Sequence, residues 1–141
     1  MAGDKVVKIG IGVLIFKNGK VLLGKRKDVG YGKGEYAGPG GHLEFGESFA
    51  NCAKRECREE AGIEIGNIRF LSLTNIKKYS GLHYVDIGLL ADWKGGTPEV
   101  LEPTKLESWG WYDLDNLPKP LFEPVKHYLQ ALKTGQTFFD E

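Results

Sequence analysis

Three glutamates, Glu56, Glu59 and Glu60, lie within one turn near the end of a predicted helix. Like charges four residues apart destabilise a helix by about 0.2–0.5 kcal/mol, and acids are disfavoured near its negatively polarised C-terminus. Hard oxygen ligands are what Mg²⁺ or Mn²⁺ requires, and a divalent ion would turn their repulsion into coordination. The cluster therefore indicates a metal site, with a solvated acidic face neutralised by neighbouring basic residues as the alternative.

The helix that carries these acids is predicted over about residues 48–61, with Gly62 as its left-handed C-terminal stop. At about 100° per residue, one side of this helix is apolar and is expected to pack inward. The inward side chains are Phe49, Ala53 and Cys57. Glu56 and Glu60 flank that side, so they are expected at the border of the core and not in bulk water.

The stretch 40-GGHLEFGESFANCAKRECREEAGI-63 resembles the Nudix box from Gly41 to Ile63. Every charged position of that pattern is present at the right interval, and Cys57 stands where a bulky aliphatic residue is usual. The resemblance implies an α/β (α+β) three-layer sandwich with a mixed β-sheet between helices. It also implies that residues 1–141 form one Nudix hydrolase domain.

The resemblance further implies roles for individual residues. The metal ligands would be the carbonyl of Gly41 together with Glu56, Glu59 and Glu60. Glu59 would be either a further ligand or the general base, and Glu102 in a later loop is the reserve candidate for the base. Arg55 and Glu47 resemble the internal ion pair that orients the helix and so supports catalysis by fixing geometry.

The resemblance extends beyond the box, and the segments 21–27, 39–48, 83–85 and 102–122 are similar to MutT-like nucleoside triphosphate diphosphatases. That subgroup includes plant enzymes acting on dihydroneopterin triphosphate or oxidised dGTP and a human enzyme acting on thioguanine nucleotides. The similarity implies Mg²⁺-dependent hydrolysis of a nucleoside triphosphate, or a modified one, to monophosphate and pyrophosphate, with Mn²⁺ as a substitute metal.

Two other functions compete with this one. ADP-ribose or another nucleoside-diphosphate-X is the rival substrate, although sugar-nucleotide and NADH types usually carry a proline-rich motif after the box and 64–80 contains no proline. A non-catalytic Nudix-fold nucleotide-binding module is the rival of another class. Such modules typically lose box glutamates, and none is missing here. An isomerase or repair-glycosylase domain would need additional catalytic segments.

The substrate pocket is predicted from single positions. Arg26 matches a phosphate-contacting position and suits a triphosphate. The other pocket candidates are Tyr36, Asp86 and Phe122. Asp86 either accepts a hydrogen bond from an amino-bearing base edge or faces solvent. Gly38 and Glu123 depart from the subgroup, which has apolar and aromatic residues there, and their presence is expected to remove stacking surface around the base.

Composition restricts the partners. The chain carries 19 basic and 19 acidic residues, so no global field favours a nucleic-acid polymer or an anionic membrane. The expected partner is a small nucleotide, and a homodimer is suggested only by analogy with the subgroup. Cys52 and Cys57 are expected to be buried, reduced thiols. The longest apolar run, 9–16, is too short to span a bilayer and ends in a turn signal, which favours a cytoplasmic location.

The elements that must position these residues follow from periodicity and turn signals. β-type segments are expected at 5–16, 20–26, 64–80, 82–93 and 108–114, with Asn18-Gly19 as a hairpin turn. The glycine-rich stretch 28–41 is expected to be a loop, or a loop around a short strand. A second helix is predicted over 121–133, closed by Gly135. Trp109 and Trp111 share one face of their strand and are expected in the core.

Overall fold

The computed structural model describes residues 5–141, in which eight strands form one mixed sheet and two helices lie on its faces. The strands are β1 (Lys8–Lys17), β2 (Lys20–Lys25), β3 (Tyr36–Ala37), β4 (Gly40–His42), β5 (Glu64–Ile76), β6 (Tyr84–Gly95), β7 (Gly110–Asp113) and β8 (Phe138–Asp140). The helices are α1 (Phe49–Ala61) and α2 (Glu123–Thr134). No helix in this part of the chain is long and apolar enough to cross a membrane.

Strand β1 organises the sheet. One of its edges pairs in parallel with β6 along Lys8–Phe16, and the order of the main sheet is β3-β2-β1-β6-β5-β8. The other edge is divided, with β4 pairing near Gly10–Gly12 and β2 pairing near Phe16 and Lys17. This division lets the segment that leads into the acidic helix enter beside the centre of the sheet.

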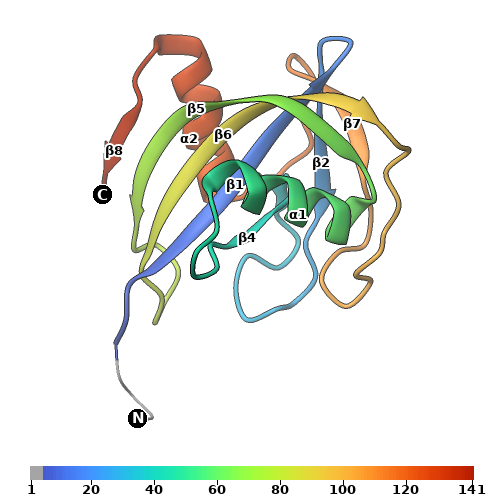
Figure 1. Ribbon diagram of the computed structural model, residues 1–141. Coiled ribbons are helices and arrows are strands. Elements are labelled where there is room, and N and C mark those ends of the chain that lie inside the picture. The colour runs from blue at the N-terminus through green and yellow to red at the C-terminus, as the bar shows by residue number, and fades with distance from the viewer. Residues whose placement is uncertain (1–4) are drawn as a thin grey trace.

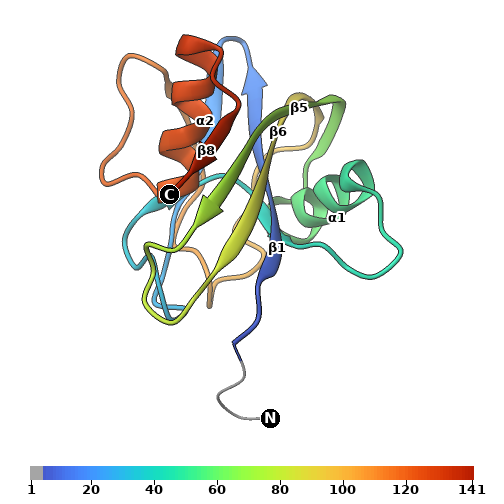
Figure 2. The same cartoon turned by 90° about the vertical axis from the view of Figure 1, so that its left-hand side faces the viewer.

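The two helices pack on opposite faces of the sheet, which gives the expected three layers (Figures 1 and 2). The core under α1 contains Ile11, Val13, Ile15, Leu22, Cys52, Ala53, Cys57, Ala61, Ile63, Ile65, Leu89 and Ala91. The core under α2 contains Leu14, Val21, Leu23, Ala37, Leu71, Val125, Tyr128, Ala131 and Phe139. Since β1 contributes to both cores, its successive side chains alternate between the two layers.

The ends of helix α1 agree with the sequence prediction. The side chain of Ser48 accepts a hydrogen bond from the backbone N–H of Asn51 at 3.0 Å and so caps the N-terminus. Gly62 ends the helix with φ 68°, and its N–H donates to the carbonyl of Arg58. Gly135 ends α2 in the same left-handed conformation.

Other predictions needed correction. Phe49 does not pack inward, because its side chain is 48% exposed. Its angle on the helical wheel points toward the core side, but it occupies the first helical position, where no other element covers it. The β-type segment 64–80 ends as a strand at Ile76, the glycine-rich stretch contains two short strands, and β8 was not expected at all.

Both cysteines and both tryptophans lie where they were predicted. Cys52 and Cys57 are buried free thiols. Burial raises the pKa of each thiol, to about 12 for Cys52, which keeps them protonated and unreactive. Trp109 and Trp111 pack against the core under α1, as their two-residue spacing predicted.

Candidate metal and nucleotide site

Arg55 is the centre of the polar network on helix α1. Its Nε and one terminal nitrogen donate to the two carboxylate oxygens of Glu47 at 2.7 and 3.1 Å. The other terminal nitrogen donates to Glu56 at 2.6 Å, and the first also donates to the carbonyl of His42 at 3.2 Å. Hydrogen bonds from Arg55 lower the pKa of Glu47 to about 2. The guanidinium thus clamps α1 to the loop before it, as the sequence predicted for this pair.

Glu56 and Glu60 meet the backbone of the entering segment. The backbone N–H of Gly40 donates to Glu60 at 2.8 Å, and a Cβ added to Gly41 would lie 2.5 Å from the carboxyl carbon of Glu56. Only glycine at position 41 lets that carboxylate approach the chain so closely. The structure therefore brings Gly41, Glu56 and Glu60 together.

The electrostatics of this pair fit a divalent cation. Burial raises the pKa of Glu56, although Arg55 opposes the shift, and burial raises the pKa of Glu60 well above its ordinary value. Glu60 is 8% exposed, and the two carboxyl groups are close enough to hydrogen bond to each other. Glu60, which is buried, and Glu56, which is largely buried and held by Arg55, form an oxygen-only ligand set that suits Mg²⁺.

A cleft of about 740 Å³ extends from these acids across the sheet, a size suited to a nucleotide. Arg26 lines it and lies against two rings, with its guanidinium carbon 4.2 Å from the centre of Phe122 and 4.8 Å from that of Tyr31. No carboxylate within residues 5–141 forms an ion pair with Arg26. Lys8, Lys105 and Arg55 also line the cleft, so four lysine and arginine side chains border it.

Aromatic side chains form one wall of the cleft. Tyr31 from the glycine-rich loop lies 5.3 Å from Tyr79 and 6.0 Å from both Tyr84 and Phe122, measured between ring centres. The rings of Tyr79 and Phe122 stack at 5.4 Å. The sequence interpretation that Gly38 and Glu123 leave the pocket without stacking surface is therefore incomplete, because loops elsewhere supply the rings.

Comparison with known proteins agrees with this geometry. The family model described as "NUDIX domain" matches residues 7–132, most of the chain. The chain belongs to the NUDIX family. An oxidized purine nucleoside triphosphate hydrolase of Mus musculus is 31% identical over 107 residues, which are 75% of this chain and 66% of that protein. An NAD-capped RNA hydrolase NudC of Stutzerimonas stutzeri is 30% identical over 121 residues, covering 85% of this chain but only 42% of that protein.

A solved structure extends the comparison to three dimensions. The MutT NUDIX hydrolase from Burkholderia pseudomallei superposes with a TM-score of 0.83 at 33% identity. The match covers 89% of this chain and 97% of that one. The NUDIX fold thus spans nearly the whole chain, whereas the chain spans about two fifths to two thirds of the two relatives named above.

The two candidates for the general base, Glu59 in the NUDIX box and Glu102 in a later loop, lie in different surroundings. Glu59 is half exposed and pairs with Arg55 at 3.3 Å, outside the lining of the cleft. Glu102 has one carboxylate oxygen that is buried and accepts no hydrogen bond, and its charge helps to raise the pKa of Glu60. Lys105 lies 3.6 Å from that oxygen.

The remaining pocket candidates divide between the cleft and the core. Asp86 and Phe122 line the cleft. Tyr36 does not; its ring meets Tyr112 at 6.1 Å and packs against the core under α2. Gly38 lines the cleft, and a Cβ there would collide with the carbonyl oxygen of Val13, so no larger residue fits this backbone.

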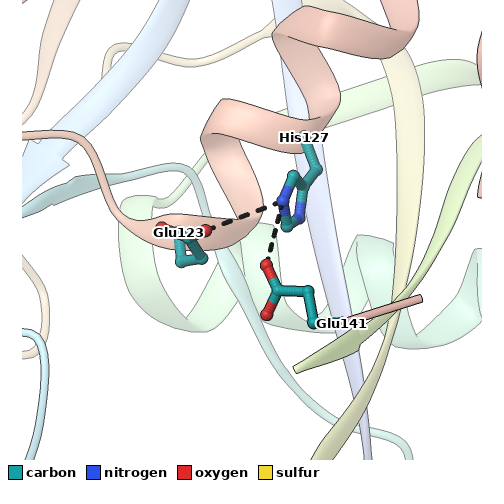
Figure 3. Close-up of side chains that lie close together, drawn as sticks. All are labelled: Glu123, His127 and Glu141. Atoms are coloured by element: carbon teal, nitrogen blue, oxygen red, sulfur yellow. Dashed lines mark ion pairs between the residues drawn. The ribbon is translucent and has the colours of Figure 1, made fainter. Parts of the chain in front are cut away.

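Glu123 lies outside the cleft, in an ion-pair network at the start of α2. His127 Nε2 lies 3.6 Å from Glu123 and 3.2 Å from Glu141, as Figure 3 shows. Lys78 and Lys126 also pair with Glu123 at 3.2 and 3.4 Å. Two lysines already pair with Glu123, and His127 links it to Glu141, so the network ties Glu141 to α2 and does not resemble the oxygen-rich pair on α1.

The sequence interpretation missed several residues of the cleft. Tyr31, Tyr79 and Tyr84 were not singled out, because aromatic residues in loops show no periodicity that would place them together. Lys8 and Lys105 were missed because they belong to different ends of the chain. A usable signal was the alternation of Gly10 with apolar residues in the first strand, since glycine in a strand often marks close approach of a ligand.

Proposed function

We propose that this NUDIX protein hydrolyses a nucleoside triphosphate to the monophosphate and pyrophosphate in the presence of Mg²⁺. The observation that carries the proposal is the placement of Glu56 and Glu60 at one end of a nucleotide-sized cleft whose other end is aromatic. Water attacks phosphorus, the anhydride P–O bond breaks, and pyrophosphate leaves with the bridging oxygen. The carboxylates serve the phosphate end and the rings serve the base end.

Glu56, Glu60 and the carbonyl of Gly41 would hold the metal, with Glu59 as a further ligand. When bound, Mg²⁺ supplies neutralisation of phosphate charge and activation of water. Arg55 keeps Glu56 and Glu47 in fixed positions through hydrogen bonds of 2.6–3.1 Å. The contribution of this chain is therefore a preorganised set of oxygens that needs little rearrangement on binding.

Arg26 would hold the phosphates. Its guanidinium lies against the rings of Tyr31 and Phe122, and one terminal nitrogen donates to the carbonyl of Tyr31 at 3.2 Å. A guanidinium without a carboxylate partner is free to bind phosphate oxygens. Lys8 and Lys105 add positive charge along the cleft.

A triphosphate is favoured by the similarity to an oxidized purine nucleoside triphosphate hydrolase and by the lysine and arginine side chains along the cleft, which can neutralise phosphate charge. The NudC relative makes an NAD-type dinucleotide, free or as an RNA cap, the second candidate. That the substrate is a free nucleotide and not part of a polymer, and that the enzyme forms a homodimer, stay predictions.

The proton acceptor for the attacking water is assigned by comparing two variants, Glu59→Gln and Glu102→Gln. Because Glu59 is engaged by Arg55 and Glu102 has a buried oxygen that accepts no hydrogen bond, we expect Glu102→Gln to lower kcat more. A larger loss of kcat in Glu59→Gln reverses this assignment.

The proposed function is tested with a panel of nucleoside triphosphates, ADP-ribose and NADH in the presence of Mg²⁺. Pyrophosphate release from at least one triphosphate is expected, and Glu60→Gln should lower turnover about 100-fold or more. The amide oxygen of glutamine still accepts from Gly40, so the variant should fold normally. Glu64→Gln, which removes an exposed acid just beyond the same helix, is the matched control. If no compound of the panel is hydrolysed, the enzyme is not a pyrophosphohydrolase of these substrates.

A further inference from the structure

Two glycines on neighbouring strands make room for one buried tyrosine. Gly12 on β1 and Gly88 on β6 are direct partners in the sheet. A Cβ added to either one would collide with Tyr128, whose ring reaches in from α2. The hydroxyl of Tyr128 donates to Oδ2 of Asp86 at 2.6 Å. The pair of glycines thus exists to place this hydroxyl against the carboxyl group.

Asp86 is a buried acid without a cationic partner. It is 7% exposed, and within residues 5–141 no lysine, arginine or histidine forms an ion pair with it. Burial raises its pKa to about 7, and the only opposing influence is the hydrogen bond from Tyr128. A carboxylate held in the interior costs stability unless its oxygens receive hydrogen bonds. Tyr128 serves Oδ2 and leaves Oδ1 for another donor.

The free oxygen borders an open trough in the sheet. Gly10 lies between His42 on β4 and Asp86 on β6, its partners in the two neighbouring strands. A Cβ added to Gly10 would lie 3.6 Å from Oδ1 of Asp86 and 3.5 Å from the ring of Tyr84, in ordinary van der Waals contact. The missing side chain therefore leaves a slot that opens to the cleft.

We propose that the Asp86 carboxylate selects the base of the substrate, with Oδ1 accepting a hydrogen bond from an exocyclic amino group that lies over Gly10. Tyr128 is the positioning residue that fixes the carboxyl group from behind. The rings of Tyr31 and Tyr84, whose centres lie 6.0 Å apart, supply the stacking surface for the same base. This inference rests on the proposed function, because it assumes a nucleotide in the cleft.

An amino group suits this acceptor better than the ring N–H of uracil or thymine. The amino nitrogen projects beyond the ring, whereas the N3–H of uracil lies between two carbonyl oxygens that an ionised carboxylate repels. Bases with an amino group are therefore expected to be preferred over matched bases without one. The suitable pairs are guanine against hypoxanthine and cytosine against uracil.

The test compares dGTP with dITP and dCTP with dUTP at pH 8, where Asp86 is ionised. In the unaltered enzyme, kcat/KM for the amino-bearing member of at least one pair should be roughly tenfold higher or more. Asp86→Leu, which keeps the branched shape of the side chain and removes the acceptor, should bring that ratio close to one. Tyr128→Phe keeps the Asp86 carboxylate but removes the hydrogen bond to its Oδ2. The ratio of kcat/KM values should then lie between those of the unaltered enzyme and Asp86→Leu. A ratio that Asp86→Leu leaves unchanged overturns the proposal.

Two further measurements separate this inference from the proposed function. Calorimetric binding of dGMP, dIMP, dCMP and dUMP needs no turnover, so an amino preference seen there supports base selection even if no triphosphate is hydrolysed. Gly10→Ala fits the fold but fills the slot, and it should weaken binding of all four monophosphates. Gly95→Ala, at a position with no atom within 4 Å of the added Cβ, is its control. Equal binding by Gly10→Ala and Gly95→Ala would show that the base lies elsewhere.

Discussion

Replacing Arg55 with lysine tests whether its hydrogen bonds, and not only its charge, place the metal ligands. The substitution keeps a positive charge but replaces the planar fork with a single ammonium group. Lysine cannot donate to both oxygens of Glu47 and to Glu56 in the observed geometry, because the three bonds start from three separate nitrogen atoms and lysine has only one. At least one carboxylate therefore loses its partner.

The size of the effect follows from those contacts. A hydrogen bond to a charged group contributes about 1.5–3 kcal/mol, and side chains that orient metal ligands typically change metal affinity by about 10–100-fold. The Arg55 side chain is 26% exposed, so solvent screens this network only in part. Arg55→Lys should therefore raise the Mg²⁺ concentration for half-maximal rate by about one order of magnitude.

The assay is the initial rate of pyrophosphate release as Mg²⁺ is varied at saturating nucleotide. Arg58→Lys is the matched control, because Arg58 on the same helix forms a similar fork with Glu64 at 2.7 and 2.9 Å but is largely exposed. Such surface pairs contribute about 0–1 kcal/mol, so the control should behave like the unaltered enzyme. An Arg55→Lys enzyme with Mg²⁺ dependence within about twofold of normal would show that its charge alone suffices.

Two further predictions concern Tyr128 on α2 and Asp86 on β6, the buried pair joined by a hydrogen bond. Gly12→Ala should lower the free energy of unfolding by about 1–3 kcal/mol in urea denaturation, because the added methyl group displaces Tyr128. The control Gly95→Ala should change it by no more than about 0.5 kcal/mol. Equal stability of the two variants would contradict the packing described. The folded-state pKa of Asp86 is about 7, above its unfolded value of about 3.9, so its favourable contribution is fully present below about pH 4 and is lost as pH rises through 7. Between pH 4 and 8, the free energy of unfolding of the unaltered protein should therefore fall by up to about 4 kcal/mol relative to that of Asp86→Asn. If chemical denaturation gives a difference between the two proteins that does not change with pH, Asp86 is not buried as an acid.

The acidic helix could be predicted from sequence because its determinants are local. Ser48, Gly62 and the spacing of Glu56 and Glu60 act within a few residues of one another, and the structure places all of them as expected. The prediction that Phe49 is buried was wrong, because the helical wheel gives the direction of a side chain but not whether another element covers it. Only the assembled layers decide that.

The base end of the cleft could not be predicted in the same way. Tyr31 and Tyr84 are 53 residues apart in the chain, yet their hydroxyl groups lie 3.5 Å from each other. Tyr36, which was expected in the pocket, sits on a short strand beside β2, and its ring packs against Tyr112. Neither outcome has a local signal, since both depend on how loops return to the sheet.

Strand β1 separates the two halves of the candidate site, because its even-numbered and odd-numbered residues face opposite sides of the sheet. Gly10 and Gly12 face the trough and Tyr128, while Ile11 and Val13 face the core beneath helix α1. Under the proposed assignment, substitution at Gly10 would alter the trough without changing the side chains beneath α1. Insertion or deletion of one residue in this strand would exchange the two faces, filling the trough with isoleucine and removing the support of the helix.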